Sequence, residues 1–403
     1  MPEKIENDEG TLKDSHKNAY LAILLLGIVS LMGDIVYEGS RGIIPSYLEL
    51  LGATAFTISF VGGLGDFLGY VFRFVSGFIA DTKRMYWPFV FLGYGLIAAI
   101  PLLGLPLGLE IAILLVLLER LGKALRSPSR DTILSVISKG VGAGKAFGIH
   151  ELLDQVGAIL GPFVVAFLML STGNYNLAFS FLSIPFLMLL AVLTYTYKKI
   201  GAQTLSIEPK KSDAQKRFLP KAFYFYTFAV LLNTVGLVPY TIILIKASEI
   251  LKPVGGEWLV PVIYLLIQGV DAPTALAAGF AYDKFGIKVL VAPFLLSLIP
   301  SLIVMGYGVE LQTIVFAAAI FGLVLGMHES IYRAAVSRFA PDFMRGTAYG
   351  IFNIAYGVGL LVGGAVYGVM ADYKLPFPII AFYAFLTQII ALLLLNISSK
   401  MRI

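Results

Sequence analysis

Two stretches of the chain decide its fold: residues 77–84 read GFIADTKR, and residues 279–288 read GFAYDKFGIK. They lie 202 residues apart in a chain of 403 residues. The same offset aligns a second group of small residues about 80 positions further along, namely Gly144, Ala146, Gly148, Gly157 and Gly161 with Gly346, Ala348, Gly350, Gly359 and Gly363. A constant offset at two distant places indicates an internal duplication. The chain is therefore predicted to consist of two related halves.

The composition restricts the class of protein to which these halves belong. The chain is 58% hydrophobic and only 14% charged, against about 25% charged residues in a soluble domain. A soluble enzyme, a nucleic-acid-binding protein and a disordered chain are excluded on these figures, and a multi-pass membrane protein is indicated. With no cysteine and only three histidines, we expect no disulfide, no metal site and no cofactor.

Apolar runs of about 20 residues, each long enough to cross the hydrocarbon core as a helix, recur along the chain. The predicted spans are 18–44, 54–80, 86–107, 110–138, 144–171, 174–197, 220–247, 256–282, 287–307, 311–339, 344–371 and 376–397. Because lipid offers no partner to a free backbone polar group, these spans should be α-helices. The fold class is thus all-α with 12 transmembrane helices.

The distribution of basic residues orients these spans. With both termini in the cytoplasm, twenty Lys and Arg side chains fall in cytoplasmic segments and three, Lys246, Lys252 and Lys374, on the opposite side. Cytoplasmic loops carry this excess of positive charge, so we expect a protein of a prokaryotic plasma membrane with both termini inside. The predicted organisation is a tail (1–17), a six-helix bundle (18–198), a basic linker (199–219), a second six-helix bundle (220–398) and a short tail (399–403).

The two repeated loops resemble the loop signature of the major facilitator superfamily. The matching residues are Gly77-x-x-x-Asp81-x-Lys83-Arg84 and Gly279-x-x-x-Asp283-Lys284-x-Gly286-x-Lys288. The resemblance implies two pseudo-symmetric six-helix bundles that rock about a central site. In the outward-open state, Asp81, Lys83, Arg84, Asp283 and Lys284 would clamp the cytoplasmic side between neighbouring helices. In the fifth span, Gly157-x-x-x-Gly161-Pro162 is similar to the Gly-Pro signature of the drug:proton antiporter branch, which implies a bend there.

The first span carries Asp34, Tyr37, Glu38 and Arg41 on one helical stripe. Ionisable groups at membrane depth are costly and are functional candidates by default. Asp34 and Glu38 are predicted proton-coupling sites, and Asp34 is preferred because it lies further from Arg41. In the alternative interpretation, Arg41 neutralises Glu38 and the group only locks the helix.

The fourth span holds the densest charge cluster, with Glu119, Lys123, Arg126 and Arg130 on one face. Glu119, Lys123 and Arg126, together with Arg41, are predicted to face the substrate, whose carboxylate or phosphate the bases could bind. Arg130 and Asp131, closer to the cytoplasm, are predicted to form gate ion pairs.

The remaining candidates lie in spans 5, 8 and 10. His150 and Asp154 are one turn apart and could relay a proton or pair with the bases of span 4. In the second half the polar residues are Gln268, Asp271, His328, Glu329 and Arg333. We expect Glu329 and Arg333 to form an intrahelical pair, with a structural or a substrate role, and Asp271 to be a proton or cation site because its span has no base.

These observations predict a proton-coupled secondary active transporter that exports a small organic solute by antiport through rocking alternating access. Its partners would be that solute, protons and membrane lipid, with no nucleic acid, and the protein would be a monomer. Neither half has a phosphate-binding Gly-rich loop, so ATP-driven transport is not supported. The alternatives are a uniporter or symporter of an organic anion bound by the basic face of span 4, and a non-transporting receptor, scaffold, membrane enzyme or lipid scramblase on the same fold.

Overall fold

A computed structural model describes residues 2–138, 141–204, 218–306, 310–341 and 344–401. All regular secondary structure in these ranges is helical. The first half contains α1 (Pro2–Arg41), α2 (Ile44–Leu50), α3 (Ala55–Lys83), α4 (Tyr86–Gly95), α5 (Ala99–Leu102), α6 (Leu109–Ile137), α7 (Ala143–Thr172), α8 (Tyr175–Phe181) and α9 (Ser183–Thr204). The second half contains α10 (Lys221–Val235), α11 (Tyr240–Leu251), α12 (Val260–Phe285), α13 (Val291–Leu296), α14 (Leu298–Val304), α15 (Leu311–Met327), α16 (Arg333–Phe339), α17 (Arg345–Asp372) and α18 (Phe377–Lys400).

Each predicted apolar run coincides with one helix or with a series of consecutive helices. Within the described ranges, nine helical stretches are long and apolar enough to cross a membrane. The longest of them, Glu257–Val304, contains three helices, α12, α13 and α14, and Tyr86–Leu102 is apolar but shorter. The structure therefore belongs to a multi-pass membrane protein. It also continues α1 back to Pro2, through the segment predicted as a charged tail.

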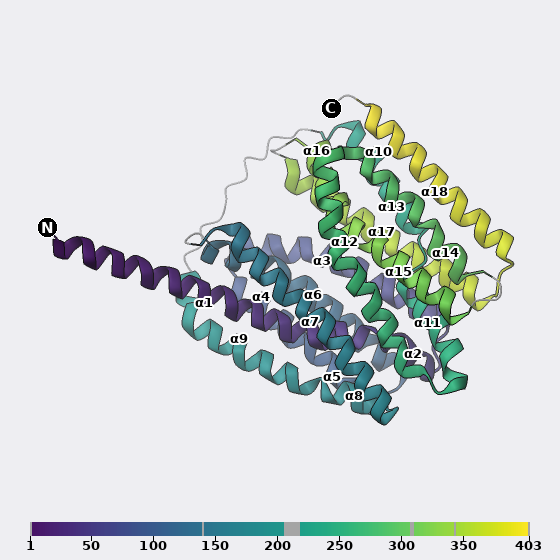
Figure 1. The fold of residues 1–403 in the computed structure, drawn as a ribbon, viewed down its shortest axis with the longest axis horizontal. Coiled ribbons are helices and arrows are strands. Elements are labelled where there is room, and N and C mark those ends of the chain that lie inside the picture. The colour runs from purple at the N-terminus through teal and green to yellow at the C-terminus, as the bar shows by residue number, and fades with distance from the viewer. Residues whose placement is uncertain (1, 139–140, 205–217, 307–309, 342–343, 402–403) are drawn as a thin grey trace.

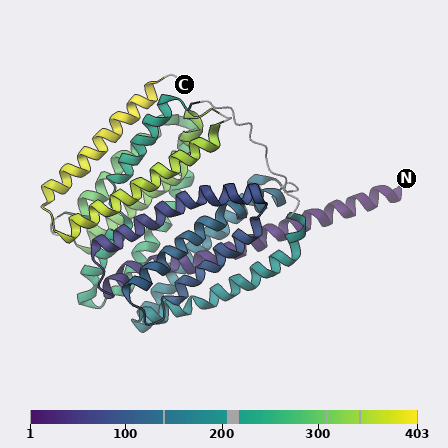
Figure 2. The same ribbon diagram turned by 180° about the vertical axis from the view of Figure 1, so that it is seen from behind.

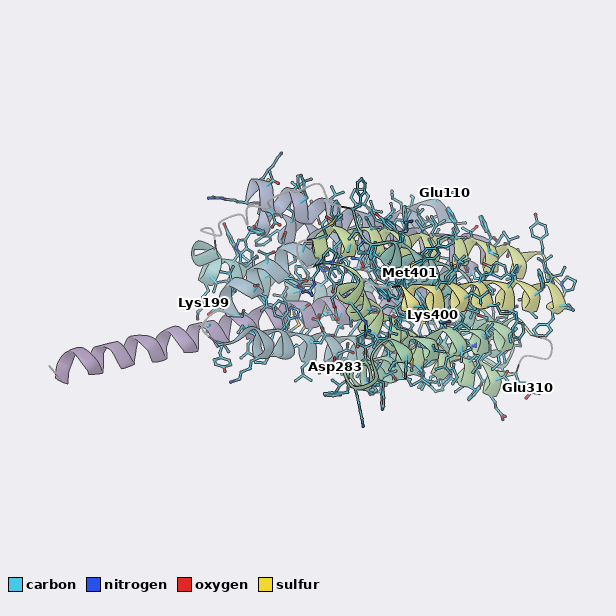
Figure 3. The ribbon with its side chains drawn as sticks, turned by 90° about the horizontal axis from the view of Figure 1, so that it is seen from above. Glu110, Lys199, Asp283, Glu310, Lys400 and Met401 are labelled. Carbon is cyan, nitrogen blue, oxygen red and sulfur yellow. The ribbon has the colours of Figure 1, made fainter. Side chains whose placement is uncertain are left out.

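The helices form two groups, which Figures 1 and 2 show from opposite sides. Helices α1, α3, α4, α6, α7 and α9 form one group, and α10 to α18 form the other. The groups meet where α3 packs along α17 and where α7 packs on α12. Both termini lie at the same end of the molecule, which we call the terminal end, and the groups separate towards it (Figure 1). Lys199 and Asp283 lie towards the terminal end, while Glu310 lies at the opposite end, the loop end (Figure 3).

Apolar and charged side chains are distributed between the surface and the interior in the opposite way to a soluble protein. Large apolar side chains point outward, as Leu152 (64% exposed), Phe163 (60%) and Phe78 (67%) do. Charged side chains such as Asp34, Glu119 and Arg126 are buried between helices. This is the pattern expected when the solvent is lipid, because a charge facing hydrocarbon is costly and an apolar side chain is not.

Glycines allow α1 and α7 to pack closely. A methyl group at Gly157 would collide with the backbone of Leu31, and one at Gly161 with the backbone of Ile35 and Gly39. Small residues at such positions let helices in lipid approach closely. Pro162 follows inside the uninterrupted α7. The glycines of the predicted bend in span 5 thus have a packing role.

Candidate functional site

A cavity of about 710 Å³ lies between the two groups of helices, a size typical of small-molecule sites. The first group lines it with α1, α3, α6 and α7, and the second with α10, α11, α12, α15, α16 and α17. Its charged and histidine side chains are Asp34, Glu38, Arg41, Asp66, Arg73, Arg120, Lys123, Arg126, Arg130, Asp131, His150, Glu151, Asp154, Asp271, Glu329 and Arg333. Among the predicted substrate or proton residues, Glu119 and His328 do not line this cavity.

Glu38 lies at the centre of a closed cluster. Its Oε1 is 2.6 Å from Arg41 Nη1 and 3.5 Å from Lys123 Nζ. The Tyr264 hydroxyl, from α12 of the other group, donates to Oε2 at 2.5 Å. This is the geometry expected when Arg41 neutralises Glu38, with the added result that Glu38 links the two groups.

Asp34, one turn earlier on α1, has different surroundings. It is 5% exposed and lines the cavity. In the described part of the chain, no basic side chain lies within 4.0 Å of its carboxylate. Asp34 is thus a buried acid that is open to the cavity and has no ion-pair partner.

The bases of α6 are held largely by neighbouring acids and aromatic rings. Arg120 Nη1 is 3.1 Å from Asp66, its Nε is 3.7 Å from Glu119, and its Nη2 donates to Tyr240 at 2.9 Å. Arg126 is 2% exposed and lies over the rings of Tyr37 and Tyr94, at 5.1 and 4.9 Å from their centroids. The predicted substrate face of span 4 is thus mostly a packed structural network.

Arg130 joins α6 to α1 and α7. It is 3.0 Å from Asp131 and 3.7 Å from Asp154, and it donates to Ser30 Oγ at 2.8 Å. Asp154 also lies 3.6 Å from His150 Nδ1. The structure brings together the residues predicted as gate and relay, all within the first half of the chain.

The polar groups of the second half are less well partnered. Asp271 is 5% exposed, and its Oδ1 is buried without a hydrogen-bond partner among the described residues. Gln268 lines the cavity one turn before it. Two buried acids, Asp34 and Asp271, one in each half, therefore face the cavity, and no basic side chain of the described residues lies within 4.0 Å of either.

The predicted pairing of Glu329 with Arg333 is wrong. Residues His328–Tyr332 form a π-helical turn between α15 and α16, and no ion pair joins these two described side chains. The wider turn removes the α-helical register on which the prediction rested, since residues four apart no longer stack. His328 stacks on Tyr332 with 4.3 Å between ring centroids, and its Nδ1 is 3.2 Å from the Tyr356 hydroxyl.

The loop end of the cavity is closed by hydrogen bonds between the two groups. Besides the Glu38–Tyr264 and Arg120–Tyr240 contacts, Thr241 and Ser59 hydroxyls lie 3.1 Å apart. The Asp372 carboxylate, at the end of α17, accepts from the backbone N–H groups of Ala55 and Phe56 at 2.8 and 3.1 Å. Asp372 thereby caps the first turn of α3 across the interface.

The charges predicted to clamp the terminal end do not do so in this structure. Lys83, Arg84, Asp283 and Lys284 are exposed and, within the part of the chain described, form no ion pair. Asp81 accepts a hydrogen bond from the Tyr86 hydroxyl at 3.0 Å. The cross-half hydrogen bonds named above thus lie at the loop end.

Sequence reasoning missed several residues of this site. Asp372 contacts backbone groups 317 and 316 positions away, and no spacing rule predicts such a contact. Arg73 and Tyr70, which are not among the candidate residues, both line the cavity.

Comparison with known proteins identifies the class and then the family. A bundle of apolar helices in two halves around a charged, one-sided cavity is the architecture of a secondary transporter. The family model of the Major Facilitator Superfamily matches residues 26–364 and 257–400. The chain belongs to this superfamily, and it is a membrane transporter and not an enzyme.

Relatives of this chain occur in bacteria and archaea. An uncharacterized protein of Mycobacterium tuberculosis is 33% identical over 365 residues, covering 89% of this chain and 88% of the relative. An uncharacterized MFS-type transporter of Methanocaldococcus jannaschii is 28% identical over 374 residues, covering 90% and 89%.

Among solved structures, a variant of the peptide transporter POT superposes with a TM-score of 0.75 at 15% identity, covering 94% of both chains. A variant of the nucleoside transporter NupG gives a TM-score of 0.74 at 16% identity, covering 93% of this chain and 99% of that one. At this identity the likeness concerns the fold alone.

Proposed function

We propose that this protein is a proton-coupled antiporter that exports a small organic solute across the plasma membrane of a prokaryote, acting as a monomer. Its cavity binds the solute and two acids, Asp34 and Asp271, carry the protons. Glu38 is reassigned from proton carrier to a link between the two halves, because two cations and a tyrosine already surround it.

One observation carries the proton coupling: Asp271 is buried beside the cavity with no base and no hydrogen-bond partner at Oδ1 among the described residues. A carboxyl group in this position can take up a proton while the cavity faces one side and release it when the cavity faces the other. Asp34 gives the first half a comparable group. Since charged groups at membrane depth are retained mainly where they are used, proton exchange accounts for both.

The topology we propose has twelve membrane crossings, as two bundles of six joined by the linker 199–219, with both termini in the cytoplasm. The excess of basic residues in the segments at the terminal end supports this orientation. The cavity closed at the loop end would then be accessible from the cytoplasm. Solute would enter there and leave after the hydrogen bonds at the loop end break.

The Gly157, Gly161 and Pro162 motif supports export by antiport. At these glycines α7 packs on α1 close to Asp34. A methyl group at Gly157 would also touch the Asp34 side chain. A change in protonation of Asp34 is thus placed to alter the α1–α7 contact. The alternative of an organic anion bound by the basic face of α6 is less favoured, since most of those bases already have partners.

The test uses proteoliposomes and a cytoplasmic metabolite extract, with accumulated solutes identified by mass spectrometry. The wild type should accumulate at least one solute against its gradient only when a pH gradient is imposed. In Asp271→Asn vesicles, solute should still exchange across the membrane but should no longer concentrate. Lys400→Gln, an exposed change in the last turn of α18 at the terminal end, is the matched control and should concentrate solute as the wild type does.

Two results would contradict the proposal. Equal accumulation with and without the pH gradient in the wild type would remove proton coupling. Undiminished accumulation in the Asp34→Asn/Asp271→Asn double variant would remove these two carriers while leaving transport itself in place.

A further inference from the structure

Two cavity-facing arginines remain without an acid once the ion pairs are assigned. Arg41, Arg120, Lys123 and Arg130 each lie within 4.0 Å of a carboxylate. Arg126 is enclosed by aromatic rings. Arg73 of α3 and Arg333 at the start of α16 form no ion pair with any described residue, and both line the cavity.

These two arginines come from opposite halves and meet around Tyr70. The Arg73 guanidinium lies 5.8 Å from the centroid of the Tyr70 ring. Arg333 and Tyr70 line the same small recess at the side of the cavity. The ring of Tyr356, from α17, packs edge-on against Tyr70 with 5.5 Å between centroids.

Their surroundings leave hydrogen-bonding capacity unused. Arg73 Nε is buried and has no acceptor among the described residues. Glu329, the acid nearest to Arg333 in sequence, does not pair with it across the π-helical turn. Both guanidinium groups thus face the cavity beside the same tyrosine, with no described carboxylate within 4.0 Å.

Paired guanidinium groups with free N–H donors match the geometry of an oxyanion. Each can bind a carboxylate or phosphate through two parallel hydrogen bonds, which are stronger than neutral ones. We propose that Arg73 and Arg333 form the binding site for the anionic group, a carboxylate or phosphate, of the transported solute. The inference rests on transport through this cavity but not on proton coupling.

The position of the site gives the anion a second effect. Arg73 lies in the part of α3 that leads to the terminal end, and Arg333 begins α16, the last helix before that end on its side of the molecule. Closing this end brings the two halves, and hence the two like charges, closer together. An anion between them removes that repulsion, so loading of the site favours closure.

The test uses the full-length protein in phosphatidylcholine nanodiscs with inorganic phosphate as the probe, at constant ionic strength in chloride. Phosphate should raise the thermal unfolding midpoint of the wild type in a saturable manner. Arg73→Gln and Arg333→Gln should each weaken phosphate binding by about tenfold or more, as expected for a lost hydrogen bond to a charged group. Arg338→Gln, an exposed arginine of the same helix, is the matched control and should bind as the wild type does.

A second arm separates a soluble anion from a lipid headgroup. Phosphatidylglycerol replaces part of the phosphatidylcholine, without added phosphate. Stabilisation by phosphate, lost in both arginine variants, supports the proposal. Stabilisation by phosphatidylglycerol alone, lost in the same variants, overturns it, and so does a phosphate effect that is unchanged in the Arg73→Gln/Arg333→Gln double variant. Failure of proton coupling would appear only in the proteoliposome transport assays and not in phosphate binding, so the two proposals fail separately.

Discussion

The two walls of the cavity carry their charges differently. On the first-half wall, acids and bases form three groups of ion pairs, which contain Asp66 with Arg120, Glu38 with Lys123, and Arg130 with Asp154. On the second-half wall, Asp271, Glu329 and Arg333 form no ion pairs with described residues. The buried polar groups behind that wall are neutral instead: Asn233 donates to Gln388 at 2.7 Å and accepts from Tyr332 at 2.6 Å.

This difference separates structural charge from charge that is free to act. A buried ion pair resists removal of either partner, because the remaining charge is left unpaired. Neutralising a buried acid that has no ion-pair partner leaves no other charge unpaired. The two walls should therefore respond in opposite ways to single substitutions.

The largest effect is expected from Arg120→Ala, which breaks the first of these groups of ion pairs. It leaves Asp66 and Glu119 without their base and removes the contact with Tyr240. The free energy of unfolding should fall by about 3–5 kcal/mol, as for other broken buried pairs. Denaturant unfolding in mild detergent would measure it, with Arg338→Ala as the control on an exposed arginine. A loss below about 1 kcal/mol would show that these ion pairs are not structural.

A smaller effect is expected from Glu38→Gln, which keeps the shape of the side chain and removes its charge. The variant no longer offers a charged acceptor to Tyr264, Arg41 and Lys123. A hydrogen bond to a charged group contributes about 1.5–3 kcal/mol to stability. Because Tyr264 lies on the other half, the loop end should open more often. The chain has no cysteine, so spin labels at Leu50→Cys and Val254→Cys would report the distance across that end.

The matched variant for this measurement is Glu49→Gln, which changes an acid on the adjacent α2 that has no cross-half hydrogen bond. Its distance distribution should equal that of the wild type. An unchanged distribution in Glu38→Gln would mean that Tyr264 does not hold the loop end closed.

Asp372→Ala tests the closure at the interface of α3 and α17. The loss of the two N–H contacts at the start of α3 should cost about 1 kcal/mol, as for other N-terminal caps. The same spin-label pair should show a modest increase in the open population. Asp372→Asn, which retains one acceptor oxygen, should fall between the alanine variant and the wild type, and an order reversed from this would exclude capping as the cause.

The smallest change in stability is expected from Asp271→Asn. Since its Oδ1 has no partner, neutralising the side chain should alter the free energy of unfolding by less than about 1 kcal/mol. The same variant should lose gradient-driven accumulation. A loss of stability comparable to that of Arg120→Ala would instead place Asp271 in a structural network and contradict its role as proton carrier.

Much of the fold could be predicted from the sequence because membrane insertion imposes simple rules. Apolar runs set the helices, and their boundaries agree with the structure to within a few residues, as α17 (Arg345–Asp372) does for the predicted span 344–371. The candidate site was predictable in its residue types, since ionisable groups at membrane depth stand out. Which of them pair was not predictable, because Glu38 with Lys123 and Arg130 with Asp154 are joined across helices.

The sequence alone indicated a helical membrane protein with two related halves, because hydropathy and the spacing of repeated residues are properties of residue order along the chain. Only the tertiary structure decided which charges are neutralised and which remain free. The π-helical turn at His328–Tyr332 separates Glu329 from Arg333, and helix packing places Arg333 and Arg73, from opposite halves, beside the same residue, Tyr70. Electrostatic partnership depends on distances of a few ångströms in space, and those are fixed by packing and not by position along the chain.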